Sequence, residues 1–127
     1  MAKNRILLVD DEPDFVEILR VILENSNYEV TVAYDGEEGL ERAKKDKPDL
    51  IILDINLPKI RGFDVCRKLK VDKNFKNIPI IMLSAAFQPN DIKFGEAMGA
   101  DAYITKESES QALLEKVREL LDKKEPS

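Results

Sequence analysis

The chain has 127 residues, of which 43% are hydrophobic and 35% are charged, as is typical of a single soluble globular domain. Its formal net charge of −5 argues against direct binding of nucleic acid, because an acidic surface repels phosphates. The absence of histidine excludes histidine metal sites, serine–histidine pairs and a phosphohistidine carrier, and the single cysteine excludes an internal disulfide.

The first predicted strand, about Arg5–Val9, ends at two consecutive acids, Asp10 and Asp11. Its short, continuously apolar run is typical of a strand that is buried on both faces. A helix is predicted from Pro13, because proline suits a first helical turn and apolar residues then recur at helical spacing from Phe15. The first strand therefore delivers two carboxylates to the point where the chain turns into a helix.

The second and third strands follow the same plan. Tyr28–Tyr34 alternates as a strand does, and Asp35 begins a capping arrangement for a helix that runs to about Lys45. The third strand, Asp49–Leu53, is again short and apolar, and it closes at Asp54. Two of the first three predicted strands thus end at carboxylates.

The alternation of strands and helices continues in the second half of the chain. We predict a third helix over Phe63–Val71, a fourth strand over Ile78–Leu83 that ends at Ser84, and a fourth helix over about Asn90–Met98. The glycine that follows this helix is a good left-handed cap.

The fifth predicted strand, Ala102–Thr105, ends at Lys106. A last helix is predicted from Ser108, which forms a capping box with Gln111. Five strand–helix units with short connections indicate one α/β domain with a parallel sheet and helices on both faces.

Four of the five predicted strands end at polar groups, and parallel strands bring these ends to one edge of the sheet, where open α/β folds bind ligands. Close carboxylate pairs repel by about 4 kcal/mol at about 4 Å and an effective dielectric of about 20, which a divalent cation such as Mg²⁺ would offset. A carboxylate can attack a phosphoryl group, and Mg²⁺ and a lysine ammonium stabilise its charge during transfer. The residues at these ends are Asp10, Asp11, Asp54, Ser84 and Lys106.

The strand ends belong to longer motifs, which occur in the order Leu7-Leu8-Val9-Asp10-Asp11-Glu12, Leu53-Asp54 with Leu57-Pro58 and Gly62, Ser84-Ala85-Ala86, and Gly99-Ala100-Asp101-Ala102-Tyr103-Ile104-Thr105-Lys106. Together they resemble a response-regulator receiver domain. The resemblance covers residues 3–121, and residues 122–127 form a polar tail or the start of a linker. It implies a flavodoxin-like, doubly wound (βα)5 fold with a five-stranded parallel sheet in the order 2-1-3-4-5.

The resemblance implies a magnesium-dependent phosphoacceptor site. Asp54 corresponds to the phosphoacceptor, Asp11 to a direct Mg²⁺ ligand, and Asp10 to a ligand that acts largely through water. Asp54 itself and the backbone carbonyl of Asn56 would supply further oxygens to the metal. A shell of six oxygens at roughly 2.1 Å suits Mg²⁺.

The resemblance also implies a switch beside the phosphoacceptor. Lys106 would pair with the phosphoryl group and Ser84 would move to hydrogen-bond it, which vacates space for the ring of Tyr103. The surface of the fourth helix, fifth strand and fifth helix then changes, and a partner reads it. Asn56 and Ala86 flank the phosphoryl position, where the family tunes the lifetime of the acyl phosphate.

Glu107 departs from the family pattern, which usually has proline after the lysine in a cis peptide bond. A non-proline cis bond costs about 3 kcal/mol, so a trans Lys106–Glu107 bond is favoured. Two interpretations stay open. Glu107 faces solvent and begins the last helix, where the helix dipole favours an acid, or it alters phosphoryl handling or partner choice.

The function that these residues favour is a phosphorylation-controlled switch of a two-component system. It would accept a phosphoryl group from a histidine kinase or phosphotransfer protein and act on a downstream effector or a fused output domain, as a monomer or a phosphorylation-dependent dimer. Its only chemistry would be its own phosphorylation and slow dephosphorylation, so we do not expect an enzyme. No signal peptide or apolar run of about 18 residues is present, which favours the cytoplasm over a membrane.

Two alternatives come from other functional classes. A Mg²⁺-dependent phosphatase with an aspartyl-phosphate intermediate, as in haloacid-dehalogenase-like enzymes, needs a second acid two residues after the nucleophile. That position holds Asn56, which argues against turnover. A receiver that serves only as a phosphorylation-independent interaction module would not need the acids, Ser84 and Lys106, although Glu107 leaves this alternative open.

Overall fold

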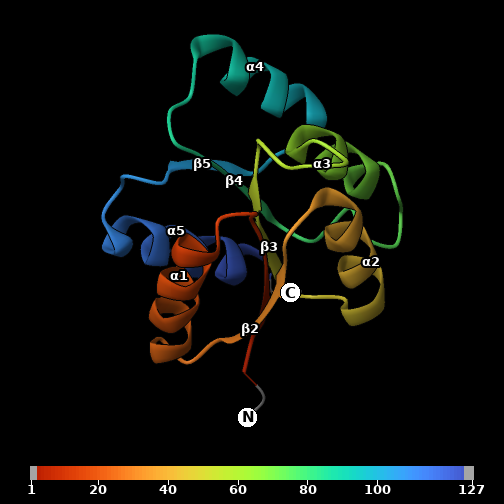
Figure 1. Ribbon diagram of the computed structural model, residues 1–127. Helices are drawn as coiled ribbons and strands as arrows, with labels where there is room; N and C mark the ends of the chain where they lie inside the picture. The colour runs from red at the N-terminus through yellow and green to blue at the C-terminus, as the bar shows by residue number, and fades with distance from the viewer. Residues whose placement is uncertain (1–2, 125–127) are drawn as a thin grey trace.

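Within residues 3–124, which the computed structural model describes, five strands and five helices alternate along the chain (Figure 1). The strands are β1 (Arg5–Val9), β2 (Glu29–Ala33), β3 (Leu50–Asp54), β4 (Ile80–Ser84) and β5 (Ala102–Thr105). The helices are α1 (Pro13–Asn25), α2 (Gly36–Asp46), α3 (Gly62–Lys70), α4 (Pro89–Met98) and α5 (Ser110–Lys124). Every element that the hydrophobic pattern predicts is present, with small differences at the ends.

All neighbouring strands pair in parallel, in the order β2-β1-β3-β4-β5. This order confirms the doubly wound, flavodoxin-like α/β fold that the resemblance implied. In the register of the sheet, Val9 of β1 lies beside Leu53 of β3. The residues that follow these two, Asp10 and Asp54, therefore meet at one edge of the sheet.

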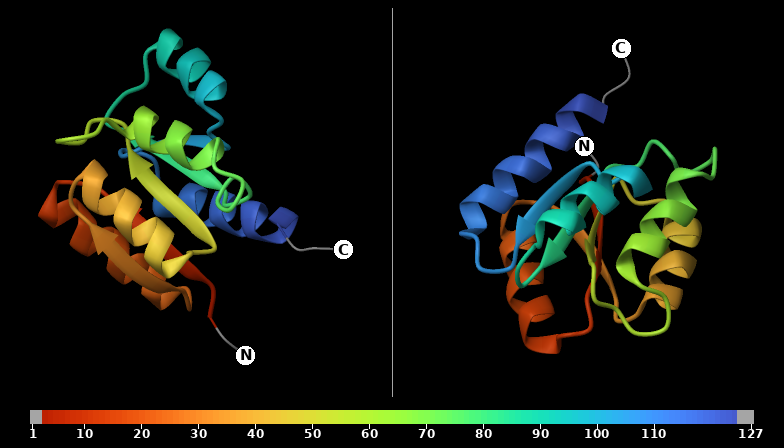
Figure 2. Two further views of the ribbon diagram at one scale, coloured as in Figure 1. Left: turned by 90° about the vertical axis from the view of Figure 1, so that its right-hand side faces the viewer. Right: turned by 90° about the horizontal axis from the view of Figure 1, so that it is seen from above.

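Helices cover both faces of the sheet, so the central strands are buried on each side (Figures 1 and 2). Ile6 and Leu8 of β1 face α1 and α5, whereas Leu7 and Val9 face the layer of α2, α3 and α4. Neighbouring residues of an extended strand point to opposite faces, which explains why these strands are apolar at every position. None of the helices within residues 3–124 combines the length and the apolar character that crossing a membrane requires.

Gly62, the first residue of α3, packs against the backbone that follows β3. Its N–H donates to the carbonyl of Ile55 at 3.2 Å, and a Cβ placed on it would lie 2.0 Å from the carbonyl oxygen of Asp54. Gly62→Ala is therefore expected to lower the free energy of unfolding by about 2 kcal/mol, because the loop after Asp54 must open. Urea unfolding measures this. In the control Gly39→Ala, a Cβ meets only the side chain of Val9, at 3.0 Å, so an equal loss there would contradict the prediction.

The start of the last helix differs from the prediction. α5 begins at Ser110, so the predicted capping box of Ser108 and Gln111 is wrong. The chain instead makes a turn after β5, in which the N–H of Ser108 donates to the carbonyl of Thr105 at 3.0 Å and the two hydroxyls lie 2.8 Å apart. The Ser108 hydroxyl is used within this turn, and the helix begins after it.

Two other boundaries differ from the sequence pattern. β4 begins at Ile80 rather than Ile78, because the intervening Pro79 has no N–H to donate to the strand ladder. α5 continues to Lys124, so the first part of the predicted polar tail is helical. Residues 125–127 of that tail lie outside the described part of the chain.

Candidate functional site

The carboxylates of Asp10 and Asp54 lie at the carboxyl edge of the sheet, and only 0% and 3% of the two residues is exposed. Asp10 comes directly after β1, and Asp54 is the last residue of β3. Asp10 Oδ1 accepts the N–H of Glu12, and Asp54 Oδ1 accepts the N–H of Asn56, both at 2.9 Å. These local turns orient both side chains and leave the two Oδ2 atoms for other partners.

Lys106 is the partner that these two oxygens share. Its Nζ lies 2.8 Å from Asp10 Oδ2 and 2.9 Å from Asp54 Oδ2. It also contacts the exposed carboxylate of Glu12. The backbone places this lysine, because its N–H donates to the carbonyl of Ser84 at 2.8 Å. Burial alone would lower the pKa of Lys106, but hydrogen bonds to Glu12 and Asp54 and the close carboxylate of Asp10 raise this pKa above the ordinary value, so the ammonium is charged at neutral pH.

One buried oxygen of this cluster lacks a hydrogen bond. Asp10 Oδ2 has the ammonium 2.8 Å away, but within the described residues no group meets it at a hydrogen-bonding angle. Carboxylate oxygens of Asp10, Glu12 and Asp54 lie within 4.8 Å of one another, close enough to share one ion. Mg²⁺ is a hard cation that takes oxygen ligands, so the residues present fit it.

Glu12 is a member of this cluster to which the pattern of strand ends did not point. The sequence could have pointed to Glu12, because this residue is the third acid in an unbroken run of acids after β1. Only the fold shows that Glu12, rather than Asp11, reaches the ammonium of Lys106. Asp11 is exposed at the surface, and its role as a direct metal ligand stays a prediction.

The Asp10 carboxyl is expected to make the stability of the metal-free chain depend on pH. Burial raises the pKa of Asp10, and repulsion from Asp54 adds to the rise, while Lys106 and the N–H of Glu12 oppose it. The folded chain therefore binds this proton more tightly than the unfolded chain does. The stability that Asp10 contributes at low pH is lost as pH rises from about 4 through the folded pKa.

We expect Asp10→Asn to gain free energy of unfolding relative to the wild type as pH rises across that window. Urea unfolding in EDTA at a series of pH values measures the difference between the two chains. A difference that stays constant with pH would contradict the prediction.

Ser84 is buried at the end of β4, and its hydroxyl is held within its own loop. Ser84 Oγ donates to the carbonyl of Ala86 at 2.9 Å and accepts the N–H of the same residue at 3.2 Å. Ala86 itself is exposed. Because the hydroxyl has one hydrogen, it would have to give up the bond to the Ala86 carbonyl before it could donate to a group attached to Asp54.

Tyr103 of β5 packs under α4. Its hydroxyl donates to the carbonyl of Ile92 at 3.2 Å, and its ring meets Phe87 edge-on at 5.7 Å between centroids. Gly95 makes room for the ring, because a Cβ there would lie 2.6 Å from Tyr103 Cε1. Burial, with a contribution from nearby Glu96, raises the pKa of Tyr103 to about 12. The position of this ring is therefore coupled to that of α4.

The remaining predicted residues lie at the rim of the site. Asn56 and Glu107 are both exposed. Glu107 occupies the turn before α5, so the interpretation that it begins the helix is wrong. The structure has no cis peptide bond within residues 3–124, so the Lys106–Glu107 bond is trans, as the cost of a non-proline cis bond predicts.

Comparison with known families and proteins gives a consistent result. The family model of the response regulator receiver domain matches residues 6–118. The chain is 42% identical over 122 residues to the alkaline phosphatase synthesis transcriptional regulatory protein PhoP of Bacillus subtilis, which is 96% of this chain and 50% of that protein. It is also 42% identical over 117 residues to the DNA-binding dual master transcriptional regulator RpaA of Synechocystis, covering 92% of this chain and 48% of that protein. The chain thus spans about half the length of the curated relatives it matches.

Solved structures show the same relationship. A CheY-like response regulator receiver domain protein from Methanospirillum hungatei superposes with a TM-score of 0.91 and 33% identity, over 97% of each chain. The chemotaxis protein CheY4 of Vibrio cholerae superposes with a TM-score of 0.88 and 31% identity, over 94% of this chain and 99% of that chain.

Proposed function

Because this chain belongs to the response regulator receiver domain family of two-component signalling, we propose that Asp54 accepts a phosphoryl group from a histidine kinase or phosphotransfer protein. The observation that carries the proposal is the ammonium of Lys106, which contacts Asp10 and Asp54 at once on a buried sheet edge. A phosphoryl group on Asp54 would find this cation already in place.

In this proposal Asp54 is the nucleophile. A carboxylate oxygen of Asp54 forms the new bond to phosphorus while the bond from phosphorus to the donor atom breaks. Asp10, Asp11, Asp54 and the backbone carbonyl of Asn56 would hold Mg²⁺, which would supply positive charge to the phosphoryl oxygens. The ammonium of Lys106 would be a second positive charge that balances the negative charge of the phosphoryl group. Asp10 holds Lys106 in position.

The response to phosphorylation runs through Ser84 and Tyr103. Phosphorylation adds negative charge beside Lys106, and Ser84 exchanges its bonds to Ala86 for a bond to the phosphoryl group. Tyr103, which contacts α4 through Ile92, then shifts with the surface of α4, β5 and α5. Asn56 and Ala86 flank the phosphoryl group and tune its lifetime. Glu107, exposed in the turn before α5, would alter phosphoryl handling or partner choice.

The test is phosphoryl uptake by the wild-type chain. Intact mass spectrometry after acetyl phosphate and Mg²⁺ should show the addition of one phosphoryl group, which EDTA prevents, and beryllofluoride should bind in parallel. A chain that takes up neither group is an interaction module and not a switch. Steady release of phosphate from p-nitrophenyl phosphate would instead favour the phosphatase alternative, whereas we propose that dephosphorylation is slow and confined to Asp54.

An apolar groove beside the site suggests where the phosphoryl donor docks. This groove, of about 250 Å³, runs between α1 and the turn that follows β5, and Lys106 forms part of its wall. The ring of Phe15 lies 4.8 Å from Lys106 Nζ. Ile18, one turn along α1, is 62% exposed. Lys106 lines this groove and contacts Asp54, so a donor that buries Ile18 would bind beside the proposed phosphoacceptor.

Ile18→Lys is therefore expected to slow phosphoryl transfer from a histidine kinase at least about tenfold, because an apolar contact worth roughly 1.4 kcal/mol is lost. Transfer from acetyl phosphate, which needs no docking, should be unchanged. Radiolabel transfer from any kinase that phosphorylates the wild type measures the rate. Val21 is 44% exposed on the same helix but does not line the groove, so Val21→Lys is the matched control. Equal losses in both variants would contradict the docking site.

We propose that the response to phosphorylation is carried out by a different domain or a different protein. Two relatives are named as transcriptional regulators, and this chain spans about half their length. We therefore propose that residues 3–121 form the receiver unit, in the cytoplasm, and that a fused output domain or a separate effector reads it. The acidic receiver unit itself would not contact nucleic acid, and it would act as a monomer or a phosphorylation-dependent dimer.

A further inference from the structure

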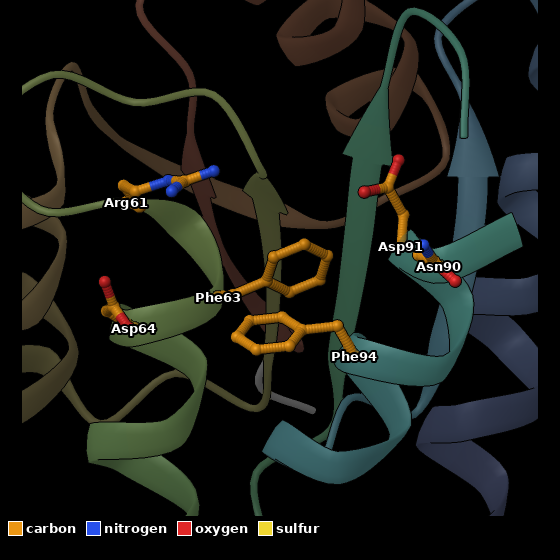
Figure 3. Close-up of a pocket in the computed structure, with 6 residues that line it drawn as sticks. All are labelled: Arg61, Phe63, Asp64, Asn90, Asp91 and Phe94. Carbon is orange, nitrogen blue, oxygen red and sulfur yellow. The ribbon is translucent and has the colours of Figure 1, made fainter. Parts of the chain in front are cut away.

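Two hollows on the surface beside α3 share Arg61 and Asp64 and belong to neither the Asp54 site nor the groove beside Lys106. One, of about 330 Å³, lies between α3 and α4 (Figure 3). The other, of about 690 Å³, follows the outer side of α3. We call this continuous surface the α3 face, and define it by Arg61, Asp64, Arg67, Lys68, Val71 and Phe94.

The first hollow has an aromatic floor. The rings of Phe63 and Phe94 face each other across the two helices, with centroids 5.1 Å apart and an interplanar angle of 76° (Figure 3). Phe94 is nevertheless 49% exposed. Asp91 on the α4 side accepts the N–H of Gln88 at 2.8 Å, so this carboxylate is used in capping α4. Phe63 is only 6% exposed, so the Phe94 ring is the apolar group that this hollow presents to a partner.

The second hollow is basic. Four cations, Lys59, Arg61, Arg67 and Lys68, line it with one acid, Asp64. Lys59 lies 3.6 Å from Asp35, but within residues 3–124 no carboxylate is within ion-pair distance of Arg61, Arg67 or Lys68. These exposed cations stand out on a chain with a net charge of −5.

The exposed apolar residues add to this pattern. Five large apolar side chains are exposed in the described part of the chain, and Ile18 and Val21 of α1 account for two of them. Two others, Phe94 and Val71, belong to the α3 face, where Val71 is 71% exposed beside the basic hollow. Unpaired cations next to exposed apolar groups are the features of a recognition surface.

We propose that the α3 face docks an acidic segment of a partner protein that carries an aromatic side chain. The aromatic ring packs edge-on against Phe94, and flanking carboxylates pair with Arg61, Arg67 and Lys68. A nucleic acid fits less well, because two acids, Asp64 and Asp91, line the first hollow and the whole chain is acidic. The proposal rests on the geometry of α3 and α4 and does not depend on phosphorylation of Asp54.

The test uses a short fluorescein-labelled peptide of aspartates and glutamates around one central phenylalanine. Fluorescence anisotropy with the full chain measures its affinity, and amide shifts of the ¹⁵N-labelled chain locate it. We expect binding with shifts in residues 61–71 and 90–95. A peptide with alanine in place of phenylalanine, and one with the acids replaced by their amides, should each bind more weakly. Absence of binding by the wild type, or shifts centred elsewhere, would overturn the proposal.

Matched variants separate specific docking from general attraction of charge. Arg67→Glu combined with Lys68→Glu should weaken binding at least about tenfold, because two ion pairs become repulsive. Lys44→Glu with Lys45→Glu makes the same change in net charge on the exposed end of α2 and should change affinity less than about twofold. Equal effects of the two double variants would overturn the proposal.

The aromatic contact is tested in the same way. Phe94→Ala should weaken binding about fivefold, whereas Val21→Ala on α1 should have no effect. A DNA oligonucleotide of the same net charge should not compete with the peptide. Effective competition would assign the surface to nucleic acid instead, and self-association of the chain that Phe94→Ala removes would assign it to a second copy. Either result would overturn the proposal.

Discussion

Asp54→Asn is expected to abolish phosphoryl uptake from acetyl phosphate in the presence of Mg²⁺. An amide lacks the negative charge that makes the Asp54 oxygen a nucleophile. The change is isosteric and removes one of two repelling buried acids, so the fold should persist. Intact mass spectrometry measures the result, and circular dichroism checks the fold.

Asp64→Asn is the control for this prediction, because Asp64 is an exposed acid on α3 outside the cluster. It should take up one phosphoryl group as the wild type does. Persistent uptake in Asp54→Asn would show that another residue is the acceptor and would contradict the proposed role of Asp54.

Lys106→Met is expected to lower the free energy of unfolding of the metal-free chain by about 3 kcal/mol. Removing the cation that contacts both Asp10 and Asp54 leaves two buried carboxylates that repel each other, and an uncompensated buried charge has a cost of this size. Methionine retains most of the aliphatic bulk of lysine, so the loss of unfolding free energy would come from the missing charge more than from changed packing. Urea unfolding in EDTA measures it.

Addition of Mg²⁺ should return a large part of this loss, because a divalent cation takes over the role of the ammonium. Lys116→Met is the matched control. Lys116 pairs with Glu119 at 3.3 Å on the exposed side of α5, where an ion pair is worth less than about 1 kcal/mol. A Lys106→Met chain as stable as this control would contradict the view that the ammonium compensates the acidic cluster.

Part of the site follows from local sequence alone. Apolar runs that stop at Asp10, Asp54 and Lys106 predict buried parallel strands, and parallel strands deliver their ends to the same edge. The convergence of these three side chains could therefore be predicted without coordinates, and the structure confirms it. The order of the strands could not be derived in this way, because alternating strands and helices are compatible with several orders. It came from the resemblance to receiver domains.

Other features depend on contacts between distant segments. Glu12, and not its neighbour Asp11, reaches Lys106, because the turn after β1 sets the direction of each acid. Tyr103 lies under α4 because Gly95 of that helix has no side chain. The Ser108 hydroxyl pairs with Thr105 instead of capping α5. In each case, several groups could occupy the same space or bind the same polar atom, and the packing of the whole chain determines which one does.

The sequence by itself determined the class of fold, the alternation of its elements and the three charged groups at their ends. These properties follow from hydrophobic period and residue type, which are local and survive small errors in boundaries. The tertiary structure alone decided which acids share the lysine, where Ser84 and Tyr103 rest, and that unpaired cations meet exposed apolar groups on the α3 face. Those properties depend on side-chain directions and on distances between segments far apart in the chain, which packing sets and no local pattern contains.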